Sequence, residues 1–162
     1  MRAVMDSSSL IFAFKVPRIY ALVSKRYGKI VIPQAVFDET VTAGKLLGKP
    51  EVQSIEGEIR KGNIILQTAN AVATESIESG EREAIGLARA LKLPLLCDDH
   101  KARVVAVSLG VQAIPLSALL LWAVRNRKMT GADALACLDL LVGAGYRLKL
   151  DVYLILRKEI ER

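Results

Sequence analysis

The chain has 162 residues, of which 52% are hydrophobic but only 5% aromatic, and this composition excludes a disordered protein and predicts one aliphatic core. Two cysteines are too few for a disulfide framework or a zinc site, and Asp6 interrupts the apolar run that a signal peptide would need, so we expect a cytoplasmic protein. The formal net charge of +6 favours polyanionic partners, and the longest apolar stretch, residues 111–124, is too short to span a bilayer.

Strands and helices alternate along the first half of the chain. Pro17 and Gly28 mark helix ends, because proline is excluded from a helix interior and glycine favours the turn that follows a helix. Gly44, Gly48 and Pro50 predict a loop. In chain order we expect a strand over residues 3–5, a helix over 10–14 with N-cap candidates at serines 7–9, a helical segment ending near 26, a strand over 30–32, a helix opened by Pro33, a helix over 51–61 and a strand over 64–66.

The second half continues the alternation and ends in helices only. Such an order implies right-handed crossovers and a parallel sheet covered by helices on both faces, with the last two helices forming a C-terminal hairpin. The expected elements are a loop over residues 68–76, a helix from 79 to about 91, a strand over 95–97, a helix ending before Gly110, a strand over 111–114 and helices over 116–127, 131–142 and 150–160.

The stretch of residues 79–103 combines an acid on a buried helix face with two acids at a strand end. Glu81 lies one turn before the apolar stripe of residues 84–91, so its side chain points inward. Asp98 and Asp99 directly follow the buried apolar strand. Open α/β sheets bind ligands at the carboxyl ends of their strands, so these acids predict a ligand site.

Two further acids occupy equivalent places. Asp6 ends the first strand, and Glu39 shares the inward face of Val36. If all these acids converge, like charges about 4 Å apart repel by about 4 kcal/mol at an effective dielectric constant near 20. No lysine or arginine accompanies all of them and His100 is the only histidine, so an all-oxygen site for Mg²⁺ or Mn²⁺ fits best. Such an ion can activate a water and neutralise charge on a phosphodiester.

Each of these residues also has a structural interpretation. Asp6 could serve only as a helix N-cap, Glu81 only as an anion favoured by a helix N-terminus, and Glu39 as an exposed acid. His100 is expected as a loop residue beside the site rather than as a general base. No glycine-rich phosphate motif supports a nucleotide cofactor, and no nucleophile signature supports a serine triad. The combination of acids therefore favours the metal site.

An ordered set of segments resembles the PIN domain family, and specifically its VapC-like prokaryotic branch. The resemblance covers about residues 1–125, and the hairpin of residues 130–162 is similar to that of one PIN subgroup. It implies a single domain of residues 1–162 with a PIN-like three-layer α/β/α sandwich and a five-stranded parallel sheet in the order 3-2-1-4-5. The segments are Val4-Met5-Asp6-Ser7-Ser8, residues 32–39 (IPQAVFDE), residues 80–85 (GEREAI) and residues 96–103 (LCDDHKAR).

The same resemblance implies roles for individual residues. Ser7 matches the small hydroxyl residue that usually follows the first aspartate, and it would orient a carboxylate or a water molecule. The catalytic acids that the resemblance implies are Asp6, Glu39, Glu81, Asp98 and Asp99, and the metal ligands among them are Asp6, Glu81, Asp98 and Asp99, for Mg²⁺ or Mn²⁺.

Two departures from the family pattern leave details open. Cys97-Asp98-Asp99 occupies the place of the usual Thr-x-Asp, so either aspartate could bind the metal. Glu81 replaces the aspartate that many members carry as the third acid, so the number of bound metal ions also stays open.

We expect a toxin-type RNA endonuclease in which a metal-activated water attacks the scissile phosphate in line and leaves a 3′-hydroxyl. The basic surface would hold the RNA backbone, and the family resemblance implies a frequent homodimer and an antitoxin partner, without a membrane. One alternative is a catalytically silent module that binds RNA or a protein. A phosphoacceptor receiver domain would need an aspartate after the third strand, and residues 64–67 contain no acid.

Overall fold

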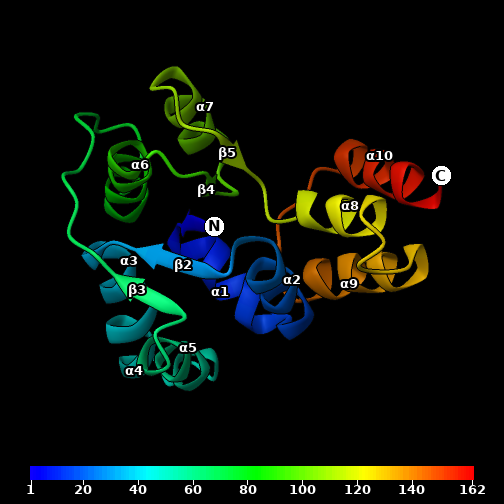
Figure 1. Cartoon of the computed structure of the whole chain (residues 1–162), viewed down its shortest axis with the longest axis horizontal. Coiled ribbons are helices and arrows are strands. Elements are labelled where there is room, and N and C mark those ends of the chain that lie inside the picture. The colour runs from blue at the N-terminus through cyan, green and yellow to red at the C-terminus, as the bar shows by residue number, and fades with distance from the viewer.

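The computed structural model describes all residues, Met1–Arg162, and places a five-stranded parallel sheet at the centre of the molecule (Figure 1). The strand order is β3-β2-β1-β4-β5, which confirms the predicted order. The first strand therefore occupies the middle of the sheet. The strands are β1 (Arg2–Met5), β2 (Lys29–Ile32), β3 (Ile64–Leu66), β4 (Leu95–Leu96) and β5 (Ala113–Ile114).

The two central strands are apolar after their first residue because both faces of the sheet are covered. In β1 the three residues after Arg2 are fully buried, and β2 shows the same pattern after Lys29. Val4 of β1 pairs with Val31 on one side and with Leu95 on the other. Continuous apolar runs of this kind are typical of parallel strands that lie between two helical layers.

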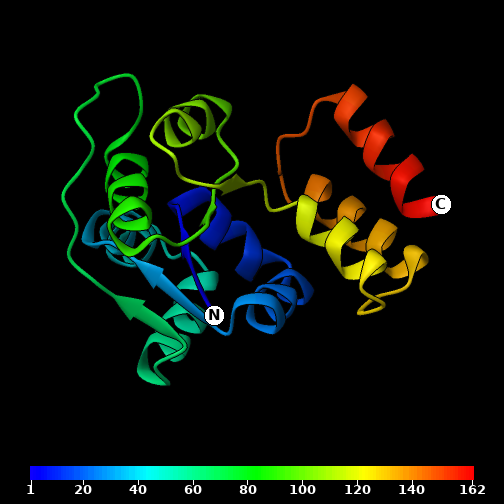
Figure 2. The ribbon, with the colours of Figure 1, turned by 45° about the horizontal axis from the view of Figure 1, so that its top comes forward.

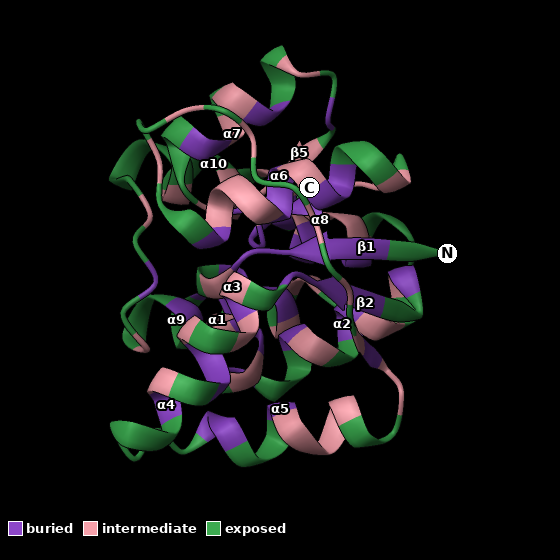
Figure 3. Cartoon of the chain, turned by 90° about the vertical axis from the view of Figure 1, so that its left-hand side faces the viewer, coloured by how far each residue is buried: buried purple, intermediate pink, exposed green.

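Helices cover both faces of the sheet, as predicted. Right-handed crossovers place α1, α2 and α5 on one face and α6 and α7 on the other, and Figure 3 shows the buried strands between these groups. No helix is both long enough and apolar enough to cross a membrane. The helices are α1 (Ser7–Lys15), α2 (Pro17–Tyr27), α3 (Gln34–Phe37), the π-helix η1 (Asp38–Thr42), α4 (Ala43–Leu46), α5 (Glu51–Arg60), α6 (Ser79–Leu91), α7 (His100–Ser108), α8 (Ala118–Arg125), α9 (Gly131–Gly143) and α10 (Leu150–Glu161).

Three local predictions need correction. The N-cap of α1 is Asp6 rather than one of the serines, because its carboxylate accepts the hydrogen bond of the Ser9 amide. Pro33 is the N-cap of α3 and not its first residue. Gly44 belongs to α4 instead of a loop, and a Cβ atom at this glycine would lie 2.6 Å from Cγ2 of Val52. Gly44 is therefore favoured by close packing against Val52. The sequence alone does not distinguish a glycine needed for packing from one needed for a turn.

Helices α8, α9 and α10 pack together beside α2, at the end of the molecule away from β3 (Figures 1 and 2). Leu119 and Leu120 of α8 and Leu138 and Leu141 of α9 are fully buried and belong to the same hydrophobic cluster as the strands. In α10 only Ile160 is buried. The predicted C-terminal hairpin is present, and its first helix provides most of its contact with the core.

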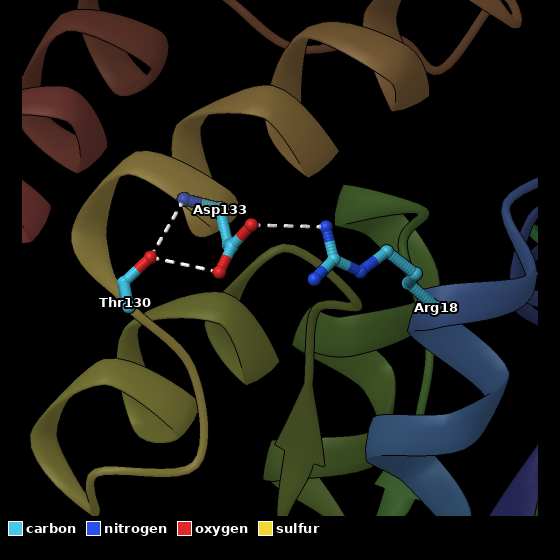
Figure 4. A network of polar contacts seen from close by, with 3 residues as sticks. All are labelled: Arg18, Thr130 and Asp133. Atoms are coloured by element: carbon cyan, nitrogen blue, oxygen red, sulfur yellow. Dashed lines mark hydrogen bonds and ion pairs between the residues drawn. The ribbon is translucent and has the colours of Figure 1, made fainter.

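A polar network on the surface connects α2 to the start of α9 (Figure 4). Arg18 Nη1 lies 3.2 Å from Asp133 Oδ1, and Thr130 Oγ1 accepts the hydrogen bond of the Asp133 amide as the N-cap of α9. The hydrogen bond from the Thr130 hydroxyl, followed by that from Arg18, lowers the pKa of Asp133. Exposed ion pairs of this kind contribute little to stability. We therefore expect this network to affect the orientation of α9 more than the stability of the fold.

Candidate active site

The acids predicted from the strand ends gather at the carboxyl edge of the sheet, where α1, α6 and α7 begin. Asp6 follows β1, and Asp98 and Asp99 follow the neighbouring strand β4. A pocket of about 470 Å³ opens beside the two aspartates that follow β4, and Asp6 is not among the residues that line it. Its titratable lining on this side consists of Glu78, Glu81, Asp98, Asp99 and His100.

Asp6 is the most deeply buried acid of the site, with 1% of its surface exposed. Its Oδ1 accepts the Ser9 amide at 2.8 Å, but its Oδ2 is buried without any hydrogen-bond partner. Burial, together with the neighbouring Asp98 carboxylate, raises the pKa of Asp6 to about 6, while the nearby Cys97 thiol and the Ser9 hydrogen bond act in the opposite direction. Asp6 therefore caps a helix with one oxygen and leaves the other free for a ligand.

Glu81 lies in the first turn of α6 and forms a capping box with Glu78. Its Oε2 accepts the Glu78 amide at 3.1 Å. Burial raises the pKa of Glu81 to about 7, and the negative charges of Asp99 and Asp6 contribute to the same direction. Asp6, Glu81 and Asp99 therefore share one electrostatic environment, as the sequence pattern predicts.

Asp98 is saturated with hydrogen bonds. Its Oδ2 accepts the Ser9 hydroxyl at 3.0 Å, and its Oδ1 accepts the Leu116 amide at 2.8 Å as well as the hydroxyl of Tyr146. Burial raises the pKa of Asp98, and these hydrogen bonds act in the opposite direction. The side chain thus joins the start of α1, the segment after β5 and the C-terminal hairpin.

Asp99 is exposed and caps α7 through the Ala102 amide, which donates to its Oδ1 at 2.9 Å. The nearby Arg103 forms no ion pair with either aspartate side chain, because its Nη1 donates to the carbonyl oxygens of Asp98 at 2.6 Å and of Cys97 at 3.4 Å, although its positive charge acts to lower the pKa of Asp98. Of the adjacent pair, Asp99 is consequently the acid with the more accessible carboxylate.

Two site predictions concern residues next to this pocket. His100 is the first residue of α7 rather than a loop residue, and its exposed side chain lines the pocket. Glu39 does not line the pocket. Its Oε1 accepts the Gly80 amide at 3.0 Å, and its Oε2 accepts the hydroxyl of Ser7. A Cβ atom at Gly80 would overlap the Glu39 carboxylate, so glycine is what allows Glu39 to approach the N-terminus of α6.

The chemistry of these side chains suits a hard divalent cation. None of the five predicted acids forms an ion pair with a lysine or arginine. No three side chains of His, Cys, Asp or Glu are close enough together to ligate one ion. Mg²⁺, however, keeps several waters and binds proteins through one or two carboxylates, so the free Oδ2 of Asp6 with a neighbouring acid fits it.

The sequence did not predict Ser9 or Tyr146 as members of the site. The Tyr146 hydroxyl donates to an aspartate 48 positions earlier in the chain, and no local periodicity encodes such a contact. The only signal was a lone tyrosine directly after Gly145, in the connection between the last two helices. The sequence pattern indicates Ser9 only as an N-cap candidate, although its amide donates to Asp6 and its hydroxyl donates to Asp98.

Comparisons with known proteins agree with this fold. A solved PilT N-terminus domain protein from the hyperthermophilic archaeon Sulfolobus solfataricus P2 is similar to the chain, with a TM-score of 0.55 and 27% sequence identity over 74% of this chain and 90% of that one. Among curated proteins, none matches the chain. The family model described as a PIN domain matches residues 2–162. The chain therefore belongs to the PIN domain family.

Proposed function

We propose that the protein is a metal-dependent endoribonuclease of the VapC toxin type, which hydrolyses phosphodiester bonds in RNA. The fold is of the PIN nuclease type, and the observation that carries the proposal is the buried Oδ2 of Asp6, which has no partner within the protein. A carboxylate oxygen without a partner costs free energy in a folded protein unless a ligand binds it. A cation at the carboxyl edge of the sheet would compensate this cost.

In this proposal Asp6 and one neighbouring acid, Glu81 or Asp99, hold Mg²⁺ or Mn²⁺, and water molecules complete the coordination. The ion, when bound, activates a water molecule and offsets negative charge that develops on the phosphate. Asp98 is already satisfied by three donors and positions the surrounding segments. Glu39 holds the first turn of α6 through Gly80 and so fixes the position of Glu81.

The remaining parts of the proposal concern the partners. The net charge of +6 supports an RNA substrate. The candidate pocket itself is acidic, so the basic side chains outside it would bind the phosphate backbone of the RNA. The VapC type further implies a homodimer and an antitoxin partner in the cytoplasm. Sedimentation would show the dimer, and a small neighbouring reading frame with a DNA-binding pattern would support the antitoxin.

The first test is cleavage of single-stranded RNA with and without Mg²⁺ or Mn²⁺. The wild type should cleave only with the metal, and Asp6→Asn should lower the rate at least about 100-fold, the scale on which loss of one electrostatic group of an active site acts. Asp151→Asn is the matched control, because Asp151 is an exposed acid of α10 outside the pocket. Circular dichroism would verify that both variants fold.

The alternative hypothesis, a catalytically silent binding module, predicts different results. Titration calorimetry with Mn²⁺ would detect no binding to such a module, and RNA would stay intact with every metal. Wild-type cleavage by Asp6→Asn would likewise refute the assignment, because the proposal depends on that carboxylate.

A further inference from the structure

The connection between α9 and α10 contributes to the acidic pocket. Gly145, Tyr146 and Arg147 line this pocket together with Asp98 and Asp99, although they lie more than 40 positions later in the chain. Figure 2 shows the connection on the side of the C-terminal helices that faces the strands. The hairpin therefore does more than cover the core, because it adds side chains to the site.

Tyr146 fixes this connection in place. Its side chain is 5% exposed, and its ring packs edge to face on Phe12 with 5.3 Å between the ring centroids. Its hydroxyl donates to Asp98 and accepts the Ser117 amide at 3.4 Å, while its own amide donates to the Leu141 carbonyl at 3.0 Å. The position of the next residue, Arg147, is determined by these contacts.

Arg147 is exposed and forms no ion pair or side-chain hydrogen bond within the protein. Arg103, the arginine that follows Asp98 and Asp99, is instead occupied by backbone carbonyls. Arg147 is the only lysine or arginine that lines the pocket. Its planar guanidinium group can donate two parallel hydrogen bonds to a phosphate.

We propose that Arg147 binds a phosphate of the RNA substrate at the mouth of the acidic pocket, and that Tyr146 positions it. This inference rests on the proposed function and names a residue that holds the substrate there. An acidic pocket repels the phosphate backbone, so a cation at its edge is needed to bring the backbone close. The hairpin thereby takes part in substrate binding.

The test measures binding separately from cleavage. Fluorescence anisotropy with a labelled single-stranded oligoribonucleotide, without divalent metal and in the Asp6→Asn background, reports affinity alone. Arg147→Ala should weaken binding about 10-fold or more, as expected for a hydrogen-bonded charge. It should also reduce the steepness of log Kd against log salt by about 0.7, the effect of one lost phosphate contact on a single strand.

Arg60→Ala is the matched control for net charge. Arg60 is an exposed arginine at the end of α5 that does not line the acidic pocket, so its loss should change affinity much less. Arg147→Lys keeps the charge but loses the forked geometry, and we expect an intermediate affinity.

A double-mutant cycle tests the positioning role of Tyr146. Tyr146→Phe should weaken RNA binding in the presence of Arg147 but have little further effect in the Arg147→Ala variant, because the hydroxyl acts through the arginine. Additive losses would show that the hydroxyl of Tyr146 only stabilises the fold, and would overturn this part of the inference. Thermal unfolding of each variant shows whether it is folded.

The outcomes separate this inference from the proposed function. If the wild type cleaves RNA with metal but Arg147→Ala binds RNA as Arg60→Ala does, the Arg147 contact is refuted and the nuclease assignment stands. If no metal supports cleavage but Arg147→Ala alone loses affinity, the nuclease assignment is refuted and the phosphate contact stands. Failure of the wild type to bind RNA refutes both.

Discussion

Asp6 serves two purposes with its two carboxylate oxygens. One oxygen caps α1 through the Ser9 amide, and the other is buried without a partner. An N-cap needs only one acceptor, so the local fold does not compete with a ligand for the second oxygen. The same residue can therefore stabilise the start of α1 and bind a cation.

Burial of Asp6 predicts an unusual pH dependence for the metal-free protein. Burial raises the pKa of Asp6 from its ordinary value of 3.8 to about 6 in the folded protein. Between about pH 4 and 6 the folded state therefore binds more protons than the unfolded state. Stability should consequently fall as the pH rises through this window. A shift of this size corresponds to about 3 kcal/mol. Urea unfolding in a chelating buffer should show Asp6→Asn gaining stability relative to the wild type at pH 7 but not at pH 4.

Asp151→Asn serves as the control for this measurement, because Asp151 is exposed and its carboxylate accepts a hydrogen bond only from the adjacent Val152 amide. An equal effect of Asp6→Asn on stability at both pH values would contradict the prediction. Addition of Mn²⁺ at pH 7 should stabilise the wild type and leave Asp6→Asn nearly unchanged, since the ion binds only the folded protein.

At the scale of elements, α6 connects the site to the segment before it. Its first turn carries Glu81 and receives Glu39, while its middle packs against the loop that precedes it. The Arg82 guanidinium group donates to the Val72 carbonyl at 3.2 Å, and the Val72 amide donates to the Arg82 carbonyl. The loop is therefore held on the same helix that positions the acid.

A pair of glycine substitutions tests this close packing. A Cβ atom at Gly86 of α6 would overlap the carbonyl oxygen of Asn70, whereas one at Gly57 of α5 has 4.0 Å to its nearest neighbour. Gly86→Ala should destabilise the protein by about 1–3 kcal/mol through overpacking. Gly57→Ala should stabilise it by up to about 1 kcal/mol through helix propensity. Equal effects in urea unfolding would show that the loop does not contact α6.

At the scale of the whole molecule, the C-terminal helices contact the rest of the chain at several places. Helix α8 packs on α2, Arg18 pairs with Asp133, and Tyr146 contacts Phe12 and Asp98. The buried residues of α8 and α9 form one hydrophobic cluster with the strands. We propose on this basis that residues 1–162 form a single domain.

Calorimetry tests the single domain. The protein should unfold in one transition with equal calorimetric and van't Hoff enthalpies, because the hairpin cannot unfold without exposing the shared core. Two transitions would contradict this prediction and place a boundary near residues 125–130. Tyr146→Phe should lower the midpoint without dividing the transition, since the ring contact with Phe12 is retained.

The sequence by itself determined the strands, most helices and the set of acids. Apolar runs preceded by Gly28, Gly62 and Pro94 encode strands and turns locally, because the hydrophobic pattern and the backbone preferences of glycine and proline are properties of neighbouring residues. The strand order followed from the family resemblance, and the structure confirms it. The catalytic roles of the acids remain a prediction.

Only the tertiary structure decided what each carboxylate contacts. Asp98 is bound by Ser9 and Tyr146, and Glu39 is bound by Gly80 instead of lining the pocket. These partners are 41 to 89 positions apart in the chain, so no helical or strand period relates them. Which acid keeps a free oxygen depends on side-chain hydrogen bonds that form only when the sheet, α6 and the C-terminal hairpin pack together.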